Sequence, residues 1–221
     1  MMKPIRVLLA EDHSLVRQGI RALLERIEDV IVVAEVGDGL DAVRVAREER
    51  ADIVLMDIKM PGLNGLDALM RLRREYPSVR VIVLSMFGGE EYFQKALDAG
   101  AAGYLLKGAD RAELALALKT VARGGTYLTP AAAQYAVESY KNPKRRKEGP
   151  IATLTSRQRE ILQLLAEGMT NKAIASRLSL SIRTVESHRA DLMERLGVHD
   201  MPSLVLIALH GGLLNDPQAI H

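Results

Sequence analysis

A short apolar run that stops at a carboxylate constrains this chain most strongly. Residues 53–56 are all apolar and rich in branched side chains, and Asp57 follows them directly. Such a run is typical of a parallel strand that is buried on both faces. Pro61 and Gly62 then turn the chain. Because open α/β sheets place their chemistry at the carboxyl ends of the strands, we expect Asp57 to lie in a functional site.

The flanking sequence repeats the same alternation of short β-rich runs and helical patterns. The expected strands are residues 5–10, 30–36, 52–57, 79–85 and 102–106. The expected helices are residues 14–26, 40–49, 66–75, 90–98 and 111–122. Regular alternation with crossover-length spacing predicts a doubly wound, five-stranded parallel sheet with helices on both faces.

The second part of the chain has a different pattern. Residues 129–140 are helical in pattern, and residues 141–149 are charged and broken by Pro and Gly, which indicates a linker. The strand signal then disappears, and four helices are expected over residues 155–167, 170–178, 181–196 and 200–210. We therefore predict three segments: residues 1–125, a linker over residues 126–152, and an all-α domain over residues 153–215.

Composition excludes several classes of protein. There is no cysteine among the 221 residues, which excludes disulfides and thiolate sites and favours a reducing compartment. No apolar run approaches the ~20 residues of a membrane helix, so we expect a cytoplasmic protein with no membrane partner. Basic residues exceed acidic ones after residue 130, partly in the run Lys144 to Lys147. That run indicates a solvated tether, with direct phosphate contact as the alternative.

Further polar residues follow the other expected strands. Glu11 and Asp12 follow the first strand, which can lie beside the third at a switch point, so three carboxylates would converge. Their repulsion requires a cation, and a site built of oxygen ligands suits Mg²⁺. Ser85 ends the fourth strand and Lys107 follows the fifth, and both are groups that stabilise phosphoryl oxygens. The alternative for Asp12 is a helix cap.

These residues stand in motifs that resemble the receiver domain of bacterial two-component response regulators. The motifs are Leu8-Leu9-Ala10-Glu11-Asp12, Met56-Asp57-Ile58-Lys59-Met60-Pro61-Gly62, Leu84-Ser85 and Gly103-Tyr104-Leu105-Leu106-Lys107. The resemblance implies a flavodoxin-like fold in which Asp57 accepts phosphate from a sensor histidine kinase. It also implies that Glu11, Asp12, Asp57 and the Lys59 carbonyl hold Mg²⁺, while Ser85, Lys107 and Tyr104 respond to the phosphoryl group. The sequence departs from many receivers at Gly108, where they carry proline.

The all-α part has the shape of a helix-turn-helix, with a short helix, a turn at residues 178–180 and a longer helix opened by Ser181. Its motifs resemble the LuxR-type DNA-binding domain, so the whole chain resembles the NarL/FixJ family. They are Leu154-Thr155-Ser156-Arg157-Gln158-Arg159-Glu160-Ile161-Leu162, Gly168-Met169-Thr170-Asn171-Lys172-Ala173-Ile174-Ala175 and Thr184-Val185-Glu186-Ser187-His188-Arg189.

The resemblance assigns DNA and dimer contacts to particular residues. It places Glu186, Ser187 and Ala190 against base edges. It makes Asn171, Lys172, Arg183 and Arg189 candidates for phosphate contacts, and Leu204, Val205 and Ile207 candidates for a dimer contact that matches a two-fold operator. Because Glu186 is acidic and Ala190 is short, base readout would rest on a carboxylate that accepts from cytosine or a methyl that meets thymine.

The function predicted from these patterns is that of a DNA-binding transcriptional regulator. It would be activated by phosphorylation of Asp57 and would dimerise when phosphorylated. It would lose the phosphoryl group by its own action without being a turnover enzyme. A phosphatase of the haloacid dehalogenase type is the enzyme alternative, but it requires a second acid where this chain has Lys59. The remaining alternative is a constitutive DNA-binding protein with an inactive receiver.

Overall fold

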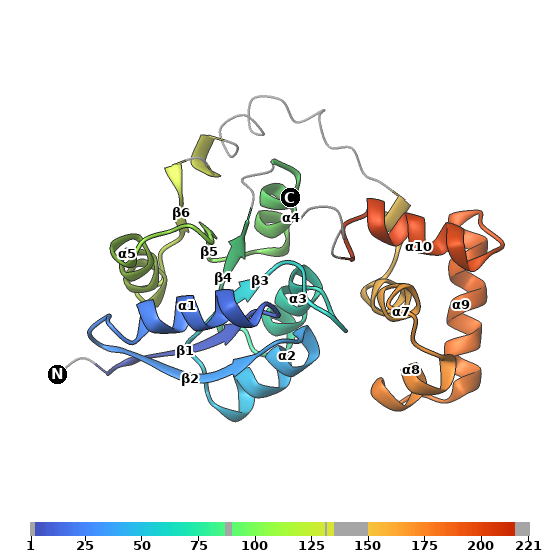
Figure 1. Ribbon diagram of the computed structural model, residues 1–221, viewed down its shortest axis with the longest axis horizontal. Coiled ribbons are helices and arrows are strands. Elements are labelled where there is room, and N and C mark those ends of the chain that lie inside the picture. The colour runs from blue at the N-terminus through green and yellow to red at the C-terminus, as the bar shows by residue number, and fades with distance from the viewer. Residues whose placement is uncertain (1–2, 87–89, 131, 135–149, 215–221) are drawn as a thin grey trace. The chain divides into compact units, whose positions relative to one another are not determined.

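The computed structural model describes residues 3–86, 90–130, 132–134 and 150–214 (Figure 1). The chain divides into two compact units, an α/β unit followed by a helical unit, and each is described by itself. The predicted basic linker, residues 141–149, lies outside the described residues, as does the second half of the helix expected before it. Within the described residues, no helix is both long enough and apolar enough to span a bilayer.

The α/β unit is built on one parallel sheet whose strands run in the order β2-β1-β3-β4-β5-β6. The strands are β1 (Ile5–Ala10), β2 (Val30–Val36), β3 (Ile53–Asp57), β4 (Arg80–Ser85), β5 (Gly103–Leu106) and β6 (Tyr127–Leu128). The prediction of a doubly wound parallel sheet is confirmed, and the first and third strands are neighbours.

The prediction of five strands is wrong by one, because β6 extends the sheet beyond β5. Residues 103 and 104 pair with residues 127 and 128, and the Thr129 N–H donates to the Tyr104 carbonyl over 3.2 Å. A strand of two residues is too short to produce an alternating pattern of apolar and polar residues. The sequence therefore gave no signal for it.

Five helices connect the strands and cover both faces of the sheet. They are α1 (Ser14–Leu24), α2 (Gly39–Glu48), α3 (Gly65–Glu75), α4 (Glu90–Ala99) and α5 (Arg111–Ala122). Helices α1 and α5 pack together on one face, and α2, α3 and α4 pack side by side on the other (Figure 1). The bounds differ from the predicted ones by two residues at most. Asp38 caps α2 and Asp110 caps α5, since each carboxylate accepts backbone N–H groups of the first turn.

The core of this unit accounts for the apolar residues of its inner strands, β1, β3, β4 and β5. Every residue of β3 is buried. Ile53 and Leu55 lie in the core on one face of the sheet, and Val54 and Met56 are also fully buried. On one face, side chains of β1, β3, β4 and β5 pack against α1 and α5. The polar residues that follow the strands are therefore held at the carboxyl edge of a rigid layer.

Over residues 150–214, the helical unit contains a short 3₁₀ turn and four α-helices. They are η2 (Pro150–Thr153), α7 (Ser156–Ala166), α8 (Asn171–Arg177), α9 (Ile182–Leu196) and α10 (Met201–His210). The four predicted helices are confirmed, and each has the cap that its sequence indicates. Thr155 forms a capping box with Gln158, and Thr170, Ser181 and Asp200 each accept a backbone N–H. Gly197 ends α9 in the left-handed conformation, with φ of 65°.

Candidate phosphoacceptor site

The predicted acids converge at the carboxyl edge of the sheet. Ala10, the last residue of β1, is paired with Met56, so the next residues along the two strands are neighbours. Glu11, Asp12, Asp57 and His13 each offer one ligand atom, and these four atoms lie within 4.8 Å of one another. The three carboxylates supply the oxygen ligands that suit Mg²⁺, so the donor set fits this cation.

Asp57 is almost completely buried, with 5% of its surface exposed. Its Oδ1 accepts the Ile58 backbone N–H over 2.8 Å, and its Oδ2 lies 3.0 Å from the Lys107 Nζ. The position at the end of a strand therefore gives the carboxylate one fixed oxygen and one oxygen that faces a cationic side chain.

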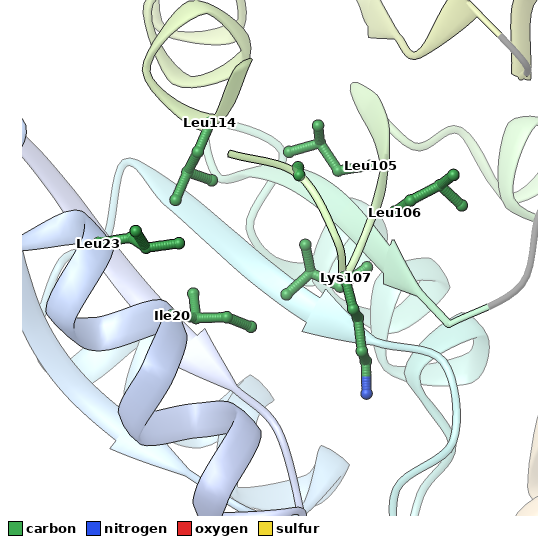
Figure 2. Close-up of a pocket in the computed structure, with 8 residues that line it drawn as sticks. Ile20, Leu23, Leu105, Leu106, Lys107 and Leu114 are labelled. Atoms are coloured by element: carbon green, nitrogen blue, oxygen red, sulfur yellow. The ribbon is translucent and has the colours of Figure 1, made fainter. Parts of the chain in front are cut away.

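Lys107 bridges two of the acids. Its Nζ lies 2.7 Å from the Glu11 Oε2 as well as 3.0 Å from Asp57. Its stem lines an apolar pocket between α1, β4, β5 and α5, and its nitrogen points away from the leucines there (Figure 2). The pocket is lined by Ile20, Leu23, Leu84, Leu105, Leu106, Lys107, Ala109 and Leu114. Apolar packing of the stem thus aims the ammonium group at the acids.

Burial raises the pKa of Asp57 from its usual value to about 6. The Lys107 ammonium opposes this increase in the pKa, whereas the charges of Glu11 and Asp12 add to it. At neutral pH, which lies above this pKa, the Asp57 carboxylate is charged, and its burial lowers the free energy of unfolding. Any cation that enters the cluster reduces this loss of stability.

A pH-dependent gain in stability follows for Asp57→Asn in the absence of Mg²⁺. The folded pKa exceeds the unfolded one, so the folded state binds more protons between about pH 4 and pH 6, and wild-type stability falls as the pH rises through that window. Asparagine avoids the cost of the buried charge, so we expect a gain of about 1–3 kcal/mol at pH 8 and little gain at pH 4.

Urea unfolding followed by tyrosine fluorescence measures the stability of the α/β unit, because all six tyrosines precede residue 141 and tryptophan is absent. Saturating Mg²⁺ serves as the control, since the cation stabilises wild type more than the variant. A gain that is equal at pH 4 and pH 8 would contradict the prediction.

His13 belongs to the cluster although the sequence did not indicate it. Its Nδ1 lies 2.7 Å from the Asp12 Oδ1 and 3.3 Å from the Glu11 Oε1. His13 is also the N-cap residue of α1, so Asp12 does not hold the cap position that was its alternative role. The five histidines are scattered in the sequence. The one sequence feature that distinguishes His13 is its position directly after Asp12.

The remaining predicted residues of this unit lie around the acids. Ser85 ends β4 with its side chain buried, and its carbonyl accepts the Lys107 N–H over 2.8 Å. Tyr104 is fully buried, and its ring meets Phe93 edge-on at 5.4 Å between centroids. The Lys59 ammonium does not lie among the acids but 5.8 Å from the centre of the Tyr92 ring.

In the helical unit, the residues predicted to contact bases form an exposed set on α9. Glu186, Ser187 and Ala190 are all exposed. Ile182, at the first position of the same helix, is an exposed apolar residue that no sequence motif singled out. Of the residues predicted to contact phosphates, Lys172 and Arg183 are exposed, whereas Asn171 and Arg189 are partly buried.

The predicted dimer contact needs one correction. Leu204 is fully buried in the core of the helical unit, so its side chain is not available to a partner. Val205 and Ile207 are partly exposed, and Leu206 is 53% exposed. The apolar run on α10 does not reveal by itself which side chains face outward, because nearly every position in it is apolar.

Comparison with known families matches both units. The family described as response regulator receiver domain matches residues 7–119, and the family described as bacterial regulatory proteins, luxR family, matches residues 152–208. The first match alone covers more than half of the chain. The chain belongs to the NarL/FixJ family of two-component response regulators. It is therefore a DNA-binding transcriptional regulator of a two-component system and not a turnover enzyme.

The response regulator has similar relatives over almost its whole length. Oxygen regulatory protein NreC of Staphylococcus aureus strain MRSA252 is 37% identical over 215 residues, covering 95% of this chain and 99% of that protein. RcsB of Salmonella enterica serovar Typhimurium, bound to promoter P1flhDC in the presence of the phosphomimetic BeF₃⁻, is 29% identical with a TM-score of 0.58, covering 92% of this chain and 97% of RcsB. ChrA, the response regulator of a heme-sensing two-component system, is 32% identical with a TM-score of 0.54, covering 96% of this chain and all of ChrA.

Proposed function

We propose that Asp57 is the phosphoacceptor of this response regulator. The observation that carries the proposal is a buried carboxylate at a strand end, with the Lys107 Nζ 3.0 Å from one oxygen and two further acids beside it. Asp57 attacks the phosphorus of a phosphohistidine on a sensor kinase, the P–N bond breaks, and an aspartyl phosphate forms. The Lys107 ammonium stabilises the negative charge on the transferred oxygens.

In this proposal Glu11, Asp12 and Asp57, with the Lys59 carbonyl, would hold Mg²⁺. The cation would offset the repulsion between the carboxylates and the incoming phosphoryl oxygens. Ser85 is the last residue of β4, the strand next to β3, and its hydroxyl serves as a further donor to the phosphoryl group. The buried Tyr104 on β5, whose ring packs against Phe93, then changes position together with Ser85.

Phosphorylation then controls DNA binding in the cytoplasm. The phosphorylated regulator forms a homodimer that binds a two-fold operator in double-stranded DNA. Helix α9 enters the major groove with Glu186, Ser187 and Ala190 toward the bases. Asn171, Lys172, Arg183 and Arg189 contact phosphates, and the outward side chains Val205 and Ile207 of α10 contact the partner. RcsB bound to promoter DNA with a phosphomimetic supports this order of events by analogy.

Intact-protein mass spectrometry after incubation with acetyl phosphate and Mg²⁺ tests the proposal. We expect one phosphoryl adduct on wild type and none on Asp57→Ala. An operator can be selected from random duplexes with the phosphorylated protein, and acetyl phosphate should then strengthen its binding by wild type but not by Asp57→Asn. A folded wild-type protein that forms no adduct would contradict the proposal and favour constitutive DNA binding.

A further inference from the structure

Arg17 on α1 contacts the backbone that carries the two acids of the first loop. Its Nη1 donates to the Glu11 carbonyl oxygen over 2.5 Å and lies 3.4 Å from the Asp12 carbonyl oxygen. The side chain is 25% exposed, so it crosses from the helix toward the loop instead of extending into solvent. Arg17 was not among the predicted site residues.

The guanidinium group of Arg17 is itself anchored from a second strand. Its Nε lies 3.9 Å from the Glu35 Oε2 on β2, and Glu35 also accepts a hydrogen bond from Arg21. The side chain is therefore held between β2 and the β1–α1 loop. Arg17 thus connects the loop that carries the acids to the neighbouring strand β2.

Glu11 is held at every polar group it possesses. Its N–H donates to the Val36 carbonyl over 3.0 Å, its Oε1 accepts the His13 N–H over 3.1 Å, and its Oε2 lies 2.7 Å from the Lys107 Nζ. The bond from Arg17 to its carbonyl oxygen comes from a side chain outside the acidic cluster. A substitution of Arg17 removes this hydrogen bond without replacing any of the acids or Lys107.

We propose that Arg17 is a positioning residue that fixes the β1–α1 loop so that the Glu11 and Asp12 carboxylates meet Mg²⁺ in one geometry. The inference rests on the proposed function of the acidic cluster. Arg17 contacts backbone carbonyls rather than the reacting groups, so it acts through the loop. Groups that orient metal ligands from outside change metal affinity by about 10–100-fold when they are removed. The affinity for Mg²⁺, and not the rate at saturation, is the quantity that Arg17 controls.

The test compares Arg17→Met with Arg21→Met on the full chain. Both variants remove a guanidinium group that faces Glu35, but the hydrogen bonds of Arg21 go to Glu25 and Glu35. For Arg17→Met we expect the Mg²⁺ concentration that half-saturates adduct formation to rise about ten-fold. The rate at saturating Mg²⁺ should stay within about two-fold of wild type. Arg21→Met should match wild type in both values, and Arg17→Lys, which keeps a cationic donor nitrogen, should recover part of the affinity.

Calorimetric titration with Mg²⁺ alone separates this inference from the proposed function, because it requires no phosphodonor. Weaker Mg²⁺ binding by Arg17→Met than by Arg21→Met supports the positioning role even if acetyl phosphate gives no adduct. Equal Mg²⁺ affinities for folded Arg17→Met, Arg21→Met and wild type would overturn it. If tyrosine fluorescence shows that Arg17→Met is unfolded, Arg17→Lys decides, and a wild-type affinity for Mg²⁺ in that variant overturns the inference.

Discussion

Lys107→Met should lower the rate of phosphoryl transfer to Asp57 by about 10²–10³-fold at saturating Mg²⁺. Methionine keeps an unbranched stem in the apolar pocket but removes the ammonium that lies 2.7 Å from Glu11 and 3.0 Å from Asp57. Two effects then act together. The transferred oxygens lose a cationic partner, and the pKa of Asp57 rises further, because Lys107 opposes the effect of burial.

Time courses of adduct formation from acetyl phosphate, read by intact-protein mass, measure the rate for Lys107→Met. Lys119→Met is the matched control, because Lys119 is exposed on α5 and the substitution is the same. The control should phosphorylate at the wild-type rate. Adduct formation by Lys107→Met at the wild-type rate would rule out the role of Lys107 in charge stabilisation.

Gly65→Ala should destabilise the α/β unit by about 3 kcal/mol or more and prevent phosphorylation of Asp57. A Cβ at residue 65 would lie 1.9 Å from the Asp57 carbonyl oxygen and 2.9 Å from its carbonyl carbon. These atoms belong to the backbone of a buried strand and cannot move aside alone. The Gly65 N–H also donates to the Ile58 carbonyl over 2.8 Å, so the start of α3 is tied to the end of β3.

Gly19→Ala is the control, and we expect it to increase the stability of the α/β unit. Gly19 is exposed within α1, and a Cβ there would meet nothing within 4 Å. Alanine is the better helix former, so this variant should gain up to about 1 kcal/mol. Urea unfolding by tyrosine fluorescence measures both changes. Equal stabilities of Gly65→Ala and wild type would show that the backbone at Asp57 tolerates the side chain.

The strands and helices could be predicted where the sequence shows a regular apolar pattern or a capping residue. Buried runs such as residues 53–56 identify parallel strands, and Thr155 and Ser181 mark helix starts by their capping chemistry. The acids could be placed at one edge because parallel strands share a direction. These inferences need only local patterns and the topology of a doubly wound sheet.

The remaining features depend on contacts between residues that are distant in the sequence. Arg17 reaches the Glu11 carbonyl across a loop, and Gly65 approaches the Asp57 backbone after a turn; neither contact has a residue pattern of its own. Leu204 and Leu206 have the same side chain, and only the packing of α10 decides which one is buried. Single residues in such positions are visible only in three dimensions.

Strand β6 ties the chain that follows α5 to the strand that carries Tyr104. Residues 127–129 bond to β5, and the Thr129 hydroxyl then accepts the N–H of the buried Ala132. A shift of β5 must therefore either break the bonds to β6 or move β6 with it. The pairing of a two-residue strand thus adds a free-energy cost to any displacement of the strand that carries Tyr104.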